Sequence, residues 1–197
     1  MMSENIKEFR KSITDEELAE LPLSFFEGKI HLVEKVEQVT EAVNYLKNQP
    51  ILGFDTETRP AFKKGQNHYV ALLQLSTADQ SFLFRINMIG LTPGLIKILA
   101  SPSILKIGAA IRDDIKILQR IKPFKPGGFV ELQELVKLYG IENFSLKKLA
   151  AIVTGVRISK AQRLSNWEAH ELNEQQQLYA ATDAWIAYEI YTGLTQK

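Results

Sequence analysis

The chain contains no cysteine among its 197 residues, so it forms no disulfide, no thiolate zinc site and no cysteine nucleophile. Histidine is also scarce, and the three histidines have no metal-site spacing to one another. Any metal site in this chain must therefore be built mainly from carboxylates, which favour hard cations.

The chain also lacks an excess of charge of one sign and any long hydrophobic run. Its 24 Lys and Arg residues nearly balance 23 Asp and Glu residues, so a polyanion would have to be held by a local basic patch. No apolar run approaches the roughly 18 residues of a transmembrane helix, and the N-terminus has no signal-peptide core. With 45% hydrophobic residues, we expect a soluble, cytoplasmic globular domain.

Hydrophobic periodicity divides the chain into a short arm and one α/β domain. Residues 1–28 are polar and mixed, and Thr14 begins a capping-box pattern with Glu17, so we expect an N-terminal helical arm. Strands are expected at 29–34, from 51 onward, at 69–77, at 81–86 and at 104–109, with 69–77 and 81–86 forming an antiparallel hairpin. Helices are expected at 37–47, 94–99, 112–121, 131–139, 145–153 and 174–192, the last one ended by Gly193. Residues 29–197 should therefore form a mixed central β-sheet flanked by helices.

The stretch Ile51 to Pro60 is an apolar run that ends in two carboxylates, Asp55 and Glu57. Alternate residues of a strand share a face, so these two side chains should point the same way, roughly 6 to 7 Å apart. Two like charges on one face repel each other unless something positive lies between them. The stretch is a candidate for one wall of a metal site.

The helix expected at 112–121 carries two adjacent acids that helical geometry separates. Asp114 falls within the apolar stripe that includes Ile111 and Leu118, whereas Asp113 lies nearly opposite and should be solvated. An aspartate on a buried stripe is unfavourable unless it is paired, hydrogen-bonded or bound to a metal. Asp114 is therefore a second candidate.

The last helix gives the same signal independently. Asn173 is a plausible N-cap, with Gln176 at the third helical position. Tyr179 and Asp183 lie one turn apart, and Asp183 falls on the same face as Ile186, so a second buried aspartate is accompanied by a phenol. Alone, such a pair is more often a structural hydrogen bond than a functional site.

These acids become informative when they are taken together. Asp55, Glu57, Asp114 and Asp183 make four carboxylates with no matching basic residues on their faces, which is electrostatically unfavourable without divalent cations. Ligands that are all oxygen favour Mg²⁺ or Mn²⁺, and a pair of such ions is the usual clamp for in-line phosphodiester hydrolysis.

Three motifs in this order and spacing resemble the DEDD superfamily of 3′-5′ exonucleases, in its tyrosine-containing DEDDy branch. They are Gly53-Phe54-Asp55-Thr56-Glu57, Lys106-Ile107-Gly108 followed by Asp114, and Tyr179-Ala180-Ala181-Thr182-Asp183. The chain looks most similar to the Werner-type exonuclease domain and more distantly to ribonuclease D. This resemblance covers roughly residues 30–194 and implies that the domain at 29–197 is a ribonuclease-H-like exonuclease. Such a domain releases nucleoside 5′-monophosphates from a nucleic acid with a single-stranded or frayed 3′ end. The resemblance also implies that the four acids bind two metal ions and that Tyr179 orients the attacking water.

Candidate substrate contacts surround these motifs. In the loop after the acidic pair, Arg59, Lys63 and Lys64 offer positive charge for a phosphate backbone, and Phe62 offers a ring for base stacking. Thr56 and His68, together with Lys160 and Arg163 on a later loop, complete the candidate set. Such residues are often only solvated, and Trp167 is expected to be a packing residue.

A different class of function stays open at this stage. The chain could act as a nucleic-acid-binding or partner-docking subunit with little catalysis of its own. The sequence also does not separate DNA from RNA, because that discrimination depends on the shape of the pocket around a 2′-hydroxyl group.

Overall fold

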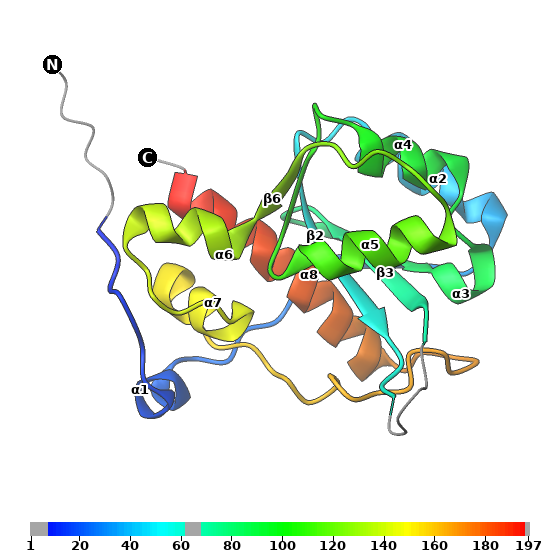
Figure 1. The fold of residues 1–197 in the computed structure, drawn as a ribbon. Helices are drawn as coiled ribbons and strands as arrows, with labels where there is room; N and C mark the ends of the chain where they lie inside the picture. Colours follow the sequence, from blue (N-terminus) through cyan, green and yellow to red (C-terminus); the bar gives the residue numbers. More distant parts are fainter. Residues whose placement is uncertain (1–7, 62–67, 196–197) are drawn as a thin grey trace, which may run out of the picture.

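The computed structural model describes residues 8–61 and 68–195, which form a mixed α/β fold around a six-stranded sheet (Figure 1). The strands, in chain order, are β1 (Lys29–Val33), β2 (Ile51–Thr58), β3 (Val70–Ser76), β4 (Gln80–Arg85), β5 (Leu105–Gly108) and β6 (Phe129–Glu131). Their order across the sheet is β1-β4-β3-β2-β5-β6, which places β2 inside the sheet between β3 and β5. The expected mixed sheet is confirmed.

The pairing of the strands also agrees with the expected hairpin. β3 pairs antiparallel with both β2 and β4, while β1 runs parallel to β4 and β5 runs parallel to β2 and β6. The register of β2 against β3 shifts between Glu57 and Thr58, which marks a bulge at the end of β2. Bulges of this kind bend a strand and re-aim its side chains.

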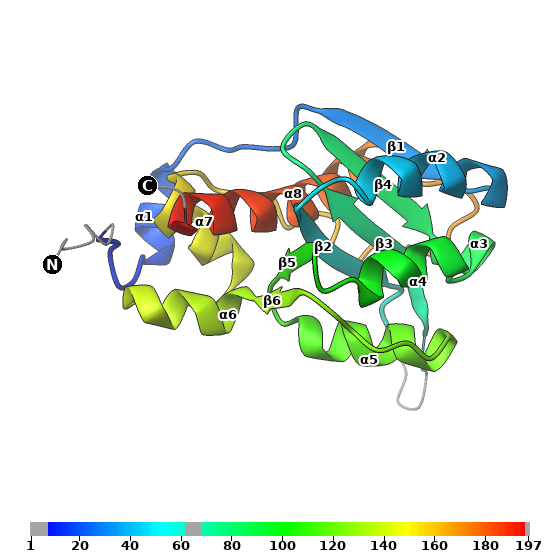
Figure 2. The same ribbon diagram turned by 90° about the horizontal axis from the view of Figure 1, so that it is seen from above.

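Helices cover both faces of the sheet. One face packs against α2 (Val36–Leu46), α4 (Pro93–Ala100) and α5 (Ile111–Ile121), through a core that includes Leu46, Leu95 and Leu118. The other face packs against α8 (Glu174–Thr195), and Figures 1 and 2 show α5 and α8 on opposite sides of the sheet. Within the described ranges, no helix is long and apolar enough to span a membrane.

A second group of helices gathers around one end of α8 (Figure 2). They are α1 (Asp15–Glu20), α6 (Leu132–Leu135), the 3₁₀ helix η1 (Val136–Tyr139) and α7 (Leu146–Thr154). The expected arm helix is present as α1, with the reciprocal capping box of Thr14 and Glu17. Leu18 of α1 is only 1% exposed, so this helix is part of the core rather than a loose appendage.

Three details of the secondary structure were predicted wrongly. The helix expected at 131–139 begins only after Glu131, because residues 129–131 pair with β5 as β6, and its second half is the 3₁₀ helix η1. Gly193 does not end α8: a Cβ there would lie 2.9 Å from Val153 Cγ1, so this glycine lets α7 pack closely on a continuing helix. The short helix α3 (Ile86–Ile89) was not expected at all.

Candidate active site

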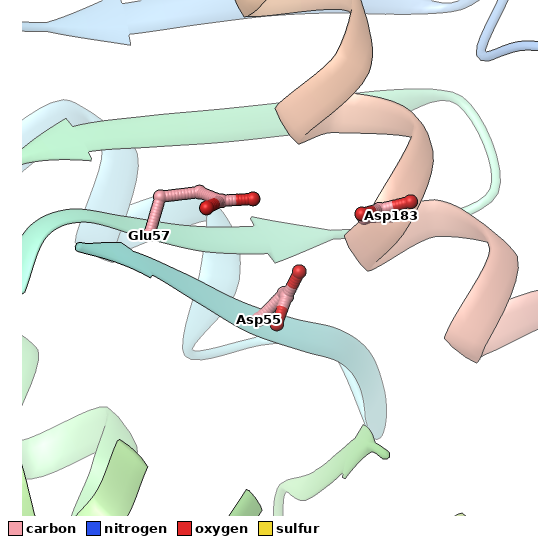
Figure 3. Close-up of side chains that lie close together, drawn as sticks. All are labelled: Asp55, Glu57 and Asp183. Atoms are coloured by element: carbon pink, nitrogen blue, oxygen red, sulfur yellow. The ribbon is translucent and has the colours of Figure 1, made fainter. Parts of the chain in front are cut away.

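β2 carries the first two acids, and its glycine explains how α8 reaches them. Asp55 and Glu57 point from the same side of β2 toward α8 (Figure 3), as the alternation of a strand predicts. A Cβ on Gly53 would lie 1.8 Å from the backbone oxygen of Ala184, the residue that follows Asp183. Only glycine allows α8 to lie this close to β2.

α8 contributes Asp183 and Tyr179 from its buried side. The helix begins at the predicted cap: Gln176 N donates to Asn173 Oδ1 at 2.9 Å, and Asn173 N donates to Gln176 Oε1 at 3.0 Å. Asp183 and Tyr179 are only 3% and 6% exposed, as expected from the helical projection. The cap therefore sets the phase that turns both side chains toward β2.

The carboxylates of Asp55, Glu57 and Asp183 converge, with one oxygen of each lying within 4.8 Å of the others (Figure 3). Burial raises the pKa of all three carboxyl groups, and mutual repulsion adds to the rise for Asp55 and Glu57, bringing the pKa of Glu57 to about 10. With a pKa of about 10, Glu57 holds a proton at neutral pH unless a cation replaces it. We call these three residues the acidic cluster.

A lysine that sequence reasoning did not place there reaches the acidic cluster. Lys160 Nζ lies 3.3 Å from Asp183 Oδ2 and 5.8 Å from the centre of the Tyr179 ring. The expectation that no basic residue matches these acids is therefore wrong for Asp183. Helix periodicity could not reveal this contact because Lys160 lies on an irregular segment 23 residues before Asp183.

Asp114 approaches β2 from the other side of the sheet. Its Oδ1 accepts a hydrogen bond of 2.7 Å from Thr56 Oγ1, and Thr56 alternates with Asp55 and Glu57 along β2. Asp114 thus lies beside the acidic cluster but is not one of the three residues whose carboxylate oxygens lie within 4.8 Å of one another. Its charge nevertheless helps to raise the pKa of Asp55. Burial raises the pKa of Asp114 itself to about 6.

The predicted phase of α5 is confirmed. Asp113 is solvated, with a side chain 82% exposed, and it pairs with Lys116 at 2.9 Å. Asp114 is half-buried on the side of Ile111 and Leu118.

A residue with no predicted role fixes the start of α5. Ala110 has a left-handed backbone, with φ at 61°, and offers no capping side chain. Instead Glu131, at the end of β6, accepts from the backbone N–H groups of Ala110 and Ile111 at 2.8 and 2.9 Å. A helix start without a capping residue signals that its donors are satisfied from elsewhere.

The segment before α8 is anchored beneath Tyr179. Trp167 is fully buried, and its ring centre lies 6.0 Å from that of Tyr179, which confirms the expected packing role. Arg85, also fully buried, pairs with Glu34 at 2.9 Å and donates to the backbone oxygens of Ala169 and His170. These contacts hold the Trp167 segment against the sheet.

The candidate substrate contacts divide into those the structure describes and those it does not. Arg59 and His68 flank the loop after β2, and both contact Glu168, at 3.3 and 3.1 Å. Arg163 is exposed. The loop residues predicted to contact phosphates and a base, Phe62, Lys63 and Lys64, lie outside the described residues.

A mixed sheet of this order, with buried carboxylates where β2 meets the C-terminal helix, defines a nuclease domain of the ribonuclease-H-like class. Residues 30–197 match the 3′-5′ exonuclease family, so the chain belongs to that family. The family resemblance seen in the sequence motifs is thereby confirmed.

Individual relatives agree with this assignment. The chain is 37% identical over 155 residues to the mouse bifunctional 3′-5′ exonuclease/ATP-dependent helicase WRN, covering 76% of this chain and 11% of that protein. It is 27% identical over 172 residues to ribonuclease D of Gluconacetobacter diazotrophicus, covering 84% of this chain and 42% of that protein. The chain thus spans less than half of either relative.

Solved structures share the fold. The EXO domain of Nibbler from Aedes aegypti superposes with a TM-score of 0.78 and 25% identity, covering 87% of this chain and 90% of that domain. Trypanosoma brucei ribonuclease D, in a complex with RNA U12, superposes with a TM-score of 0.77 and 18% identity, covering 87% of this chain and 64% of that one. At 18% identity, this second likeness shows a shared fold and nothing more.

Proposed function

We propose that this chain removes nucleotides one at a time from the 3′ end of DNA or RNA, by metal-dependent hydrolysis that releases nucleoside 5′-monophosphates. The observation that carries this proposal is the convergence of Asp55 and Glu57 of β2 with Asp183 of α8 within 4.8 Å. Membership of the 3′-5′ exonuclease family supports the direction of attack.

The acidic cluster fits divalent cations. Its three side chains supply only oxygen atoms, which suit Mg²⁺ or Mn²⁺ better than zinc. Burial and repulsion raise the pKa of Asp55 and Glu57, so a bound cation would relieve an unfavourable concentration of negative charge. The ammonium of Lys160 pairs with Asp183, and its charge lowers the pKa of Asp55 and Glu57 by less than burial and repulsion raise it. We assign two metal ions to this site, with Asp114 as a fourth ligand at its edge.

When bound, such a pair of ions activates the attacking water and stabilises the leaving 3′ oxygen. The residues of the chain supply the positioning. Asp55 and Glu57 hold one wall of the site on β2, while Asp183 closes it from α8. Thr56 orients the carboxylate of Asp114 through their hydrogen bond of 2.7 Å.

Tyr179 is suited to orient the water rather than to deprotonate it. Burial and the neighbouring charges of Asp183 and Glu57 raise the pKa of its phenol above the ordinary value. The hydroxyl group therefore stays protonated at neutral pH and acts as a hydrogen-bond donor or acceptor. The ring of Trp167 packs against the ring of Tyr179 and helps to hold it in place.

Basic and polar side chains around the acidic cluster are suited to hold the substrate. Lys160, on the α8 side, and the exposed Arg163 are proposed to bind phosphates of the 3′-terminal nucleotides. Arg59 and His68, both held by Glu168, extend this surface beyond the end of β2. Phe62, Lys63 and Lys64 remain proposed contacts on the loop between them.

The direct test is digestion of 5′-labelled DNA and RNA oligonucleotides by the purified chain in Mg²⁺ or Mn²⁺. We expect a ladder of products shortened from the 3′ end, abolished by EDTA and by Asp55→Ala. The matched control is Asp15→Ala, which removes a 79% exposed carboxylate on α1 and should leave the ladder unchanged. Binding of either polymer without hydrolysis in either metal would instead support the binding-subunit alternative.

A further inference from the structure

Gln74, in the middle of β3, is a buried polar side chain that the site as described above does not use. It is 0% exposed. Neither its side-chain oxygen nor its side-chain nitrogen has a hydrogen-bond partner among the described residues. A buried amide in this condition is unfavourable, so such groups in folded proteins nearly always serve a partner.

The register of the sheet places Gln74 beside the acidic cluster. Gln74 is the cross-strand partner of Asp55 in the antiparallel pairing of β3 with β2. Side chains of directly opposed residues point to the same face, with Cβ atoms about 4.5 to 5.5 Å apart. Gln74 therefore lies on the face of β2 and β3 that α8 covers, within reach of the Asp55 carboxylate.

On its other side, Gln74 faces an apolar side chain. Leu83, its cross-strand partner on β4, is fully buried in a hydrophobic cluster that also contains Leu72 and Tyr179. The acidic cluster also has an unpaired acceptor, because Asp183 Oδ1 is buried and has no hydrogen-bond partner within residues 8–61 and 68–195. An orphaned amide and an undersatisfied group of carboxylates thus share one buried face.

We propose that Gln74 is a positioning residue of the metal site, whose side-chain amide donates a hydrogen bond to the Asp55 carboxylate when cations are bound. This inference rests on the proposed function. A donor on one oxygen of Asp55 fixes the plane of the carboxylate and leaves the other oxygen for the cation. A neutral amide does so without opposing the positive charge of the cation, which an ammonium group would do.

The test replaces Gln74 with Met, which keeps the length of the side chain and removes its donor. Mn²⁺ affinity, measured by calorimetry without substrate, should fall by about tenfold or more, the range found for partners of metal ligands. The melting temperature of the metal-free protein should not fall, because the substitution removes an orphaned polar group from the core. Hydrolysis at saturating Mn²⁺ should largely recover.

Ser76→Ala is the matched control on the same strand and face. Ser76 and Ser81 share a buried hydrogen bond of 2.7 Å between their hydroxyl groups, two residues along β3 from Gln74. This control should lower the melting temperature and leave Mn²⁺ affinity unchanged.

The two proposals fail in different ways. If Gln74→Met lowers the melting temperature and leaves Mn²⁺ affinity at the wild-type value, Gln74 has only a structural role and the inference is overturned while the proposed function stands. If the wild-type chain neither binds Mn²⁺ nor degrades either polymer, the proposed function fails and this inference fails with it.

Discussion

At the scale of single residues, the two adjacent acids of α5 show how local geometry separates function from solvation. Asp113 is exposed and held by Lys116, which lowers its pKa, whereas burial raises the pKa of Asp114 to about 6. The two residues share a charge and a neighbourhood in sequence, but only Asp114 contacts β2, through Thr56. Removal of the charge should therefore affect the active site at Asp114 and only a surface ion pair at Asp113.

We expect Asp114→Asn to lower the rate of 3′-end digestion by more than about 100-fold, because loss of a ligand should exceed the cost of losing a supporting partner. Asp113→Asn should keep the wild-type rate within a factor of about two, since a surface ion pair contributes little. Both rates can be measured on the same labelled oligonucleotide. Equal losses in the two variants would show that the side of α5 on which Asp114 lies is unrelated to catalysis.

The raised pKa of Glu57 makes metal binding dependent on pH. Its folded-state pKa of about 10 lies above the ordinary carboxyl value, so the metal-free native state holds a proton that the unfolded chain has lost at neutral pH. Protons bound only by the native state make stability fall as pH rises. Glu57 therefore favours the folded metal-free protein most at pH values below the ordinary carboxyl pKa, and this contribution to the melting temperature declines toward alkaline pH.

Binding of Mg²⁺ must then displace the proton of Glu57. We expect release of at least about one proton per protein at pH 7, seen by calorimetry in two buffers with different heats of ionisation, and an affinity that rises from about pH 6 to about pH 8. Glu57→Gln, whose side chain does not titrate in this pH range, should release less. A wild-type protein that releases no protons would contradict the buried, protonated state of Glu57.

At the scale of elements, the position of α8 depends on the missing side chain of Gly53. In Gly53→Ala, the added Cβ would meet the backbone oxygen of Ala184 at 1.8 Å, so α8 must move away from β2. We expect a loss of at least about 1 to 3 kcal/mol of stability, as for overpacked cores, together with weaker Mn²⁺ binding because Asp183 moves with the helix. Denaturant unfolding and calorimetry measure the two effects.

Gly140→Ala separates these two effects. Gly140 has a left-handed backbone, with φ at 72°, and an added Cβ would meet nothing within 4 Å. This substitution should cost about 1 to 2 kcal/mol through backbone strain alone and leave Mn²⁺ affinity unchanged. If both glycine variants kept wild-type Mn²⁺ affinity, close packing of α8 on β2 would not be what positions Asp183.

The elements also show which parts of the site a sequence can predict. The shared face of Asp55 and Glu57 and the phases of Asp114 and Asp183 follow from local periodicity, and the family motifs add their order. The contact of Lys160 with Asp183 does not follow, because it depends on where an irregular segment runs in space. The same holds for the capping of α5 by Glu131, which joins residues about 20 positions apart through the unexpected strand β6.

At the scale of the whole molecule, the N-terminal arm belongs to the same packed body as the nuclease core. Its segment around Leu23 bridges Arg157, and the Phe26 backbone donates to Thr182 of α8 at 3.0 Å. Arg157 Nε donates a hydrogen bond of 2.9 Å to the backbone oxygen of Leu21. The sequence predicted the helix in this arm but not its docking, since a capping box carries no information about distant partners. The boundary near residue 28 stays a prediction.

Leu18 tests whether the arm and the core unfold together. Leu18 is 1% exposed and packs in the cluster that contains Ile186 and Ile190 of α8. We therefore expect Leu18→Ala to lower the free energy of unfolding by about 2 to 5 kcal/mol, as for other buried leucines, within a single cooperative transition. Leu138→Ala is the matched control, because Leu138 is 80% exposed and its truncation should change stability by no more than about 0.5 kcal/mol. Two separate transitions in the wild-type protein, with only the weaker one shifted by Leu18→Ala, would instead show that the arm folds independently of the sheet that carries the acidic cluster.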